Sequence, residues 1–186
     1  EASSAFDRVW HEGLLHKLQS IGISGKLLDW FKHYLTDRYQ RVVLGGSCSE
    51  WIRIEAGVPQ GSILGPLLFP IYINDIVDNI HSDILLFADD TSLLKTLIDE
   101  ASIMDINSDL ETLRQWAADW LVNFNPTKTK YMIFSKKHNK VNYPDLHIGD
   151  TVLDKVQKHK QLGITFNDSM TWDDHIDNIC IHQTTS

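Results

Sequence analysis

Ile84-Leu85-Leu86-Phe87-Ala88-Asp89-Asp90-Thr91-Ser92-Leu93-Leu94 is the stretch of this 186-residue chain that says most about its fold. Two apolar runs flank a pair of acids, which predicts a strand, a two-residue turn at Asp89-Asp90 and a second strand. Adjacent carboxylates repel each other at such a tip, where Asn-Gly would turn more easily. A bound divalent cation removes that repulsion, because Mg²⁺ and Mn²⁺ take hard oxygen ligands. Taken alone, the motif also fits a plain structural turn.

The segments around this hairpin predict an α+β chain. Apolar spacing predicts helices over residues 10–21, 25–36 (with Ser24 as N-cap), 61–80, 98–122 and from 171 onward. Strands are expected at 41–44 and 51–54, joined through Gly45-Gly46-Ser47, at 129–134, and two or three times within 143–166. Pro66 and Pro70 should lie in the first turns of their helix or kink it, and Asn125-Pro126 should end the 98–122 helix. This order predicts a mostly antiparallel sheet with helices packed on one face, leaving the other face open to a large substrate.

Composition sets limits on the function. Hydrophobic residues make up 42% of the chain, which suits a packed core, and no apolar run is long enough to cross a bilayer. Only Cys48 and Cys180 are present, so a disulfide framework and a cysteine zinc site are excluded, and a reducing, intracellular setting is expected. The first residue is Glu rather than Met, which predicts an internal piece of a longer protein.

Charge is unevenly distributed along the chain. The formal net charge is −8, but residues 128–160 carry 8 basic and 3 acidic groups. An acidic chain is a poor candidate for nucleic-acid binding as a whole. The local basic strip is compatible either with a nucleic-acid contact beside an acidic metal centre or with a solvated loop around Lys136-Lys137-His138-Asn139-Lys140.

Two further segments carry candidate chemistry. Gly57-Val58-Pro59-Gln60-Gly61-Ser62-Ile63-Leu64-Gly65-Pro66 leads into an apolar helix. Glycine at a loop-to-helix junction lets the backbone approach a ligand closely, and Gln60 adds a neutral donor and acceptor. The third segment, Ala5-Phe6-Asp7-Arg8-Val9-Trp10, carries no signal of its own.

In this order, the three segments resemble the reverse-transcriptase palm of non-LTR (LINE) retrotransposons, above all the jockey-like elements. The resemblance covers nearly the whole chain and includes Trp116, Trp120, Asn125 with Lys128-Thr129, Met132-Ile133-Phe134 and Gln161-Leu162-Gly163-Ile164. It implies a polymerase palm over residues 1–166 and the start of a truncated thumb over residues 167–186. The activity implied is that of an RNA-directed DNA polymerase, a nucleotidyltransferase.

The resemblance also implies roles for single residues. Asp89, Asp90 and Glu1 stand where such enzymes bind catalytic Mg²⁺ or Mn²⁺. Among the substrate-binding positions, Phe6 would be the aromatic gate that favours dNTPs, Gln60 and Gly61 would line the nucleotide and template pocket, and Lys128 would lie beside the triphosphate. Leu162, Gly163 and Ile164 match the turn called the primer grip. Trp116 and Trp120 are interpreted as core anchors rather than base-stacking platforms.

At one position this chain departs from the family pattern. The family carries a metal-binding Asp where this chain has Glu1. The longer side chain displaces the carboxylate by about 1.5 Å, and misplacements of that size can cost about 100-fold in rate. This departure leads to the hypothesis that the 186-residue chain by itself is inactive or nearly so.

The implied partners are an RNA template, a DNA primer and dNTPs, with no membrane. The fingers, the rest of the thumb and an endonuclease would belong to the same longer polyprotein, and the location would be the nucleus or cytoplasm, within a retrotransposon ribonucleoprotein. Two alternatives stay open: a catalytically inactive remnant that binds RNA or a partner, and an unrelated Mg²⁺-dependent hydrolase using Asp89 and Asp90.

Overall fold

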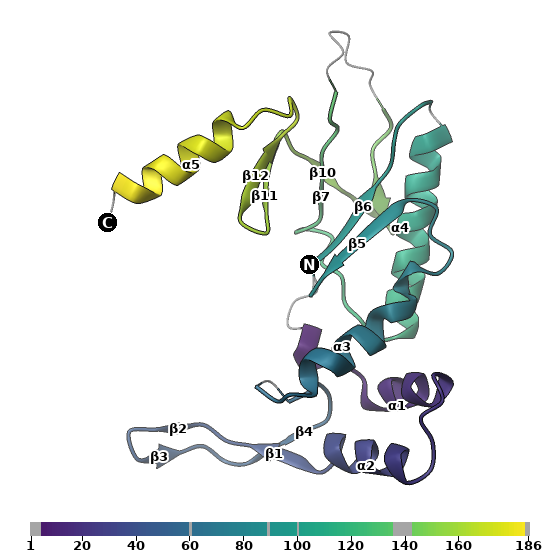
Figure 1. Cartoon of the computed structure of the whole chain (residues 1–186), viewed down its shortest axis with the longest axis vertical. Coiled ribbons are helices and arrows are strands. Elements are labelled where there is room, and N and C mark those ends of the chain that lie inside the picture. The colour runs from purple at the N-terminus through teal and green to yellow at the C-terminus, as the bar shows by residue number, and fades with distance from the viewer. Residues whose placement is uncertain (1–4, 60, 89, 100, 136–142, 185–186) are drawn as a thin grey trace.

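The chain folds into small helical and β-ribbon units that meet at two hydrophobic cores (Figure 1). A computed structural model describes residues 5–59, 61–88, 90–99, 101–135 and 143–184. In this part of the chain there are five α-helices and two 3-10 helices: η1 (Ala5–Arg8), α1 (His11–Ser20), α2 (Lys26–Leu35), α3 (Gly65–Ile73), η2 (Asn74–Val77), α4 (Ala101–Asp119) and α5 (Asp173–Thr184). The predicted α+β class is therefore confirmed.

The strands pair two by two. Five pairs are antiparallel and the β7–β10 pair is parallel. The pairs are β1 (Arg38–Gln40) with β4 (Ile52–Ile54), β2 (Val43–Leu44) with β3 (Ser47–Cys48), β5 (Asp83–Phe87) with β6 (Asp90–Leu94), β7 (Lys130–Tyr131) with β10 (Asp154–Lys155), β8 (His147–Ile148) with β9 (Thr151–Val152), and β11 (Lys158–Gln161) with β12 (Ile164–Asn167).

The described strands thus do not join into the single sheet that the sequence predicts. Eight of these twelve strands contain only two or three residues. So short a strand offers few backbone groups on its outer edge, and a further strand gains little by pairing with it. Figure 1 shows the resulting shape, in which the β1–β4 ribbon with β2–β3 forms an arm at one end and α5 extends from β11–β12 at the other.

The first core joins α1, α2 and α3. Leu14 and Leu18 of α1 are completely buried, as the apolar spacing of the 10–21 segment predicts. Around them pack other buried residues of the same cluster: Val9, Phe31, Leu35, Val58, Leu68, Phe69 and Tyr72. In Figure 1, α3 runs between the α1–α2 pair and the β5–β6 hairpin. The first core therefore lies on the side of α3 that faces α1 and α2.

A buried lysine lies inside this core. Lys17 lies on the apolar side of α1, donates to the backbone oxygen of Tyr72 and pairs with Asp75 at 2.5 Å. Its Nζ lies 3.6 Å from the centre of a Trp120 ring, and Trp116 donates to the same Asp75 carboxylate at 2.8 Å. Burial lowers the pKa of Lys17, and Asp75 counteracts part of that shift. Trp120 packs on this core, as predicted, whereas Trp116 is half-buried against the Lys17–Asp75 pair.

The second core lies along the N-terminal half of α4. Ile103 and Leu110 of that helix pack with Leu146 and Leu153, which flank the β8–β9 ribbon. Leu153 also donates its backbone N–H to the Leu146 oxygen at 2.8 Å. Because Trp120 at the end of α4 packs on the first core, this one helix links both cores.

Several predicted element boundaries differ from the observed ones. The helix predicted over 61–80 begins only at Gly65, with Pro66 in its first turn and Pro70 inside it, and gives way to η2 at Asn74. The residue at the N-cap of α2 is Gly25 rather than Ser24. The 98–122 helix ends at Asp119, before Asn125-Pro126, because Leu121 adopts a positive φ of 53° and Val122 donates back to Ala117. The strand predicted over 129–134 is reduced to β7.

Candidate functional site

The β5–β6 hairpin is the centre of the candidate site. Its register pairs Phe87 with Asp90, so Asp90 belongs to a strand and not to the turn. The predicted turn at Asp89-Asp90 is therefore wrong at Asp90, which is the first residue of β6 and is half-buried. Ala88 has a φ of 51°, a left-handed conformation that Asn or Gly adopts more easily. The structure of Asp89 itself lies outside the described residues.

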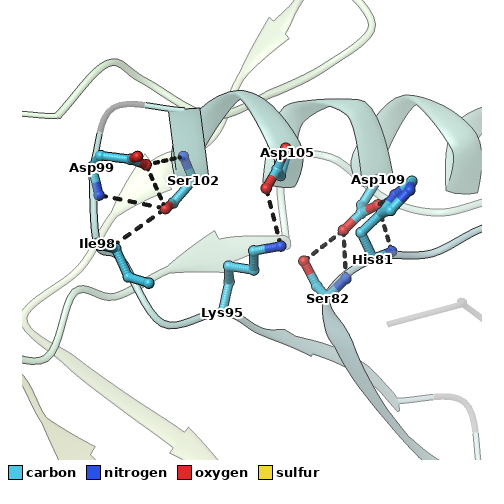
Figure 2. A network of polar contacts seen from close by, with 8 residues as sticks. All are labelled: His81, Ser82, Lys95, Ile98, Asp99, Ser102, Asp105 and Asp109. Carbon is cyan, nitrogen blue, oxygen red and sulfur yellow. Dashed lines mark hydrogen bonds and ion pairs between the residues drawn. The ribbon is translucent and has the colours of Figure 1, made fainter.

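Polar contacts hold the open end of this hairpin against α4 (Figure 2). Asp109 of α4 is completely buried and accepts from the backbone N–H groups of His81 and Ser82 at 2.9 and 2.8 Å. The Ser82 hydroxyl and the His81 ring also contact this carboxylate. Just past the other strand, Lys95 pairs with Asp105 at 3.1 Å. Both strands are thus fixed to one helix at the end opposite the acidic tip.

Hydrogen bonding controls the charge state of Asp109. Burial by itself would raise its pKa, but the hydrogen bonds from His81 and Ser82 outweigh burial and hold the pKa below the ordinary 3.8. The carboxylate therefore stays ionised at neutral pH and accepts several donors at once.

The start of α4 is capped by a second small network, also drawn in Figure 2. Asp99 accepts from the backbone N–H of Ser102 at 3.0 Å and from its hydroxyl at 2.9 Å. The Ser102 oxygen in turn accepts from the backbone N–H of Ile98 at 3.3 Å. This reciprocal arrangement satisfies donors at the helix N-terminus and fixes where α4 begins after β6.

Phe6 and the glycine-rich loop meet at a second part of the site. The Phe6 ring stacks on Phe69 of α3, with centroids 4.5 Å apart and planes inclined by 28°. Val58 donates its backbone N–H to the Phe6 oxygen, and Gly57 donates to the Val9 oxygen, both at 2.8 Å. The Gly57 oxygen accepts from His11 Nε2 at 2.8 Å and from Arg38 at 3.3 Å. These bonds hold the loop against the segment that bears Phe6.

Gly57 cannot be replaced freely at this contact. Its φ is +87°, and a Cβ atom on it would lie 2.7 Å from the Asp7 carbonyl oxygen. Further along the loop, Ser62 donates to the Pro59 oxygen at 2.7 Å and accepts from the Gly65 N–H at 3.0 Å, which turns the chain into α3. Gly61 is exposed with a φ of +75°, whereas Gln60 lies outside the described residues.

The turn between β11 and β12 is an exposed hairpin tip. Leu162 and Gly163 have positive φ values of 48° and 83°, and the flanking Gln161 and Ile164 are paired. Leu162 and Ile164 are exposed. Next to this tip, Gln161 Nε2 donates to the Ser92 hydroxyl of β6, two residues after Asp90. The predicted primer-grip turn is therefore connected to the strand that carries Asp90.

Lys128 lies on an exposed turn, whereas two other lysines of the basic strip form ion pairs. Lys128 is exposed, on a turn in which Asn125 Oδ1 accepts from the Thr127 hydroxyl at 2.7 Å. Two other lysines of the 128–160 segment are engaged in ion pairs: Lys130 with Asp154 and Lys158 with Asp174. Lys136 to Lys140 lie outside the described residues, so the choice between a contact strip and a solvated loop stays open.

The predicted metal ligands fall partly outside the described chain. Within the described ranges, no group of three or more His, Cys, Asp or Glu side chains is arranged to hold a metal ion. Glu1 and Asp89 are not among those residues, whereas Asp90 is. None of the described helices is long and apolar enough to cross a membrane.

The contacts thus gather the candidate residues into two sets. Phe6 lies with the loop that leads to Gly61, and Asp90 lies with the Leu162–Ile164 turn through Ser92 and Gln161. Sequence reasoning missed His11, Lys17 and Asp109 as positioning residues. A signal did exist for Lys17, which falls within the apolar stripe formed by Leu14, Leu18 and Ile21.

Comparison with known proteins indicates the family of the chain. A sequence model of the family described as reverse transcriptase (RNA-dependent DNA polymerase) matches residues 1–166. The chain is 32% identical over 190 residues to an RNA-directed DNA polymerase from mobile element jockey of Drosophila melanogaster, covering 96% of this chain. It is 32% identical over 186 residues to a probable RNA-directed DNA polymerase from transposon BS of the same species. A Pol polyprotein from the R2 element of Popillia japonica is 30% identical over 137 residues, covering 67% of this chain. The chain spans only 20% of the jockey and BS relatives and 22% of the R2 relative.

Proposed function

Because this chain belongs to the reverse transcriptase (RNA-dependent DNA polymerase) family, we propose that it carries the polymerase site of a jockey-like non-LTR mobile element. The reaction would be RNA-templated addition of dNTPs to a primer 3′-OH. The observation that carries this proposal is the β5–β6 hairpin, which is fixed to α4 at one end and has Asp90 beside its tip at the other. In a family member, a rigidly held acidic tip is where a charged triphosphate would react.

Asp89, Asp90 and Glu1 would hold Mg²⁺ or Mn²⁺. Carboxylate oxygens suit these hard cations, and the half-buried Asp90 lies beside the hairpin tip, directly opposite Phe87. When bound, such ions lower the pKa of the primer hydroxyl and neutralise the triphosphate.

The remaining residues would position the substrates. Phe6, held by its stack on Phe69, would present a flat wall against the sugar and exclude a ribose 2′-OH. Gln60 and Gly61 would contact the nucleotide and template, and Lys128 would bring positive charge to the triphosphate. The Leu162–Ile164 turn would hold the primer end, with Gln161 fixing its distance from β6 through Ser92.

We assign residues 1–166 to the palm and residues 167–186 to the start of the thumb. The projection of α5 away from the rest of the chain supports a boundary near β12. Fingers, the remaining thumb and an endonuclease would come from the same longer polyprotein, acting in a ribonucleoprotein in the nucleus or cytoplasm. RNA template, DNA primer and dNTPs are the proposed partners.

One residue favours a second candidate function. Glu1 stands where the family pattern requires Asp, and its extra methylene would move the carboxylate by about 1.5 Å. An inactive family member that still binds nucleic acid is therefore the alternative.

Mg²⁺-dependent incorporation of dTTP on poly(rA)/oligo(dT) tests the proposed function. We expect at most weak extension by the wild-type chain, which Glu1→Asp should increase, Asp89→Ala should abolish and Asp83→Ala, a matched control at the open end of the same hairpin, should leave unchanged. No extension by the 186-residue chain, together with recovery in Glu1→Asp, would assign the loss to residue 1. Extension that survives Asp89→Ala would contradict the proposed site.

A further inference from the structure

The arm that contains the β1–β4 ribbon carries two arginines and two aromatic residues on one face, in these strands and in the residues next to them. Tyr39 lies opposite Arg53 in the ribbon register. The Arg41 guanidinium lies over the Trp51 ring, 4.6 Å from its centre. Since alternate residues of a strand share a face, Tyr39, Arg41, Trp51 and Arg53 form one continuous surface, here called the arm face.

The arm face is open to solvent. Trp51 is 59% exposed and Tyr39 is 56% exposed, although both are large aromatic side chains. The opposite face is used differently: Arg38 donates to the Gly57 oxygen and so anchors the arm to the loop beside Phe6. Figure 1 shows the arm projecting from α2 and α3, away from both cores. The aromatic rings are therefore not committed to either core.

The charge of the arm is opposite to that of the whole chain. Residues 38–54 contain three arginines and one glutamate, whereas the chain has a net charge of −8. Arg53 faces Asp37 at 3.4 Å, an exposed pair that a competing phosphate can displace. Positive groups set between exposed rings attract a polyanion whose flat bases can stack.

We propose that the arm face binds single-stranded nucleic acid, with unpaired bases stacked on Trp51 and Tyr39 and phosphates paired with Arg41 and Arg53. The identity of that strand as template RNA rests on the proposed function. Strand β4 leads within a few residues to Gly57 and the loop that contains Gly61, so an unpaired template beyond the reacting nucleotide would lie over the arm. A duplex offers no free base faces, so it would not use the arm face in this way.

Fluorescence anisotropy with a labelled, unstructured 12-nucleotide RNA tests this proposal. The whole 186-residue chain is titrated in EDTA without dNTPs, so a chain that fails the incorporation assay still reports on the arm face. Trp51→Ala should weaken binding at least about fivefold, whereas Trp51→Phe should retain most of it. Ile52→Ala, a change of an exposed neighbour on the opposite face, should leave the affinity unchanged.

Charge and strand state provide two further readouts. Arg41→Gln should reduce the slope of log affinity against log salt by about 0.7, the contribution of one phosphate contact to a single strand. A 12-base-pair RNA–DNA hybrid should bind without sensitivity to Trp51→Ala. RNA binding that is equal in wild type and Trp51→Ala would overturn the proposal. Self-association that is lost in Trp51→Ala, with unchanged RNA binding, would instead assign the arm to contact between copies of the chain.

Discussion

At the scale of single residues, Gly57 is the most constrained position near the candidate site. Its backbone N–H and oxygen are both bonded to the N-terminal segment, through Val9 and His11. Its φ of +87° favours glycine, and the Asp7 backbone fills the space that a side chain would need. The contact between the loop and the Phe6 segment therefore depends on a missing Cβ atom.

Gly57→Ala should lower the free energy of unfolding by about 2–5 kcal/mol, the sum of left-handed strain and steric overlap. Gly46→Ala provides a matched control, because Gly46 has nearly the same φ, +83°, with nothing within 4 Å of the added Cβ. That control should lose only about 1–2 kcal/mol. Urea unfolding followed by circular dichroism measures both. Equal losses would show that the approach to Asp7 is not a constraint.

Residue types near the site could be predicted from sequence better than their exact places. The sequence predicts the glycine-rich loop and the hairpin around the acidic pair, but the observed register puts Asp90 in β6 rather than in the turn. Turn position depends on which residues pair across the strands, and an alternating apolar pattern on both sides allows more than one register. Gln161 and Ser92 are 69 residues apart, so no local pattern predicts their bond.

At the scale of elements, α4 acts as the support of the β5–β6 hairpin. Asp109 and Asp105, one turn apart on α4, reach the residues before β5 and after β6 respectively (Figure 2). The two contacts differ in burial, because Asp109 is fully buried and Asp105 is exposed. The buried one should dominate the energetics.

Asp109→Asn should lower the free energy of unfolding by about 2–4 kcal/mol at pH 7, because several donors lose a charged acceptor. The pKa of Asp109 is depressed on folding, so its contribution is complete above its ordinary pKa of 3.8 and is lost as the pH falls through the lower folded value. The difference between wild type and variant should therefore shrink below about pH 4. Urea unfolding at a series of pH values measures this.

Asp105→Asn is the control on the same helix. Its pair with Lys95 is exposed and should contribute less than about 1 kcal/mol. A loss as large as that of Asp109→Asn would show that the exposed pair matters as much as the buried carboxylate, and a difference for Asp109→Asn that does not shrink as the pH falls below 3.8 would show that the charge of Asp109 does not support the hairpin.

Helices could be predicted well and strand partners poorly. The apolar stripes of α1 and α2 fix their existence within a residue or two at each end. Helix α4 ends because Leu121 adopts a positive φ, and a leucine in the sequence does not predict that backbone conformation. The strands exist near the expected places, but their pairing depends on register and contacts across the chain rather than on local composition.

At the scale of the whole molecule, two cores meet along one helix. The first core is formed by α1, α2 and α3. The second is formed by the N-terminal half of α4 and the residues that flank the β8–β9 ribbon. In sequence, α4 lies between the segments that build the two cores, so each core can form largely from its own side of the chain. Cores that are separate in this way open with different free energies.

Leu153→Ala should therefore increase hydrogen exchange at the amides of β8, β9 and the first half of α4, with little change in α1. Removing this buried side chain costs about 2–5 kcal/mol, all of it within the second core. Leu14→Ala, its counterpart in the first core, should have the reverse effect. Mass spectrometry of exchanged peptides resolves these segments. Uniform acceleration across both cores in either variant would show one cooperative unit instead.

Helical spacing predicts buried residues on α1 and α4, but it does not show that they belong to two separate cores. Apolar spacing identifies Leu14 and Leu110 equally well as buried, yet gives no sign that they belong to different clusters. The order of helices and strands predicts one mostly antiparallel sheet, whereas the described strands form separate two-stranded ribbons.

Helix α4 holds the β5–β6 hairpin at its open end, far from the tip. The hairpin is held at His81, Ser82 and Lys95, and its free end carries the acidic pair. Five residues in each strand give a free length of about 17 Å. Movement at the tip of such a hairpin grows with the length of its strands and with any looseness of the contacts at its open end. How steadily Asp90 is held thus depends on contacts away from the tip: the Asp109 carboxylate at the far end of the hairpin and the Gln161–Ser92 hydrogen bond two residues along β6.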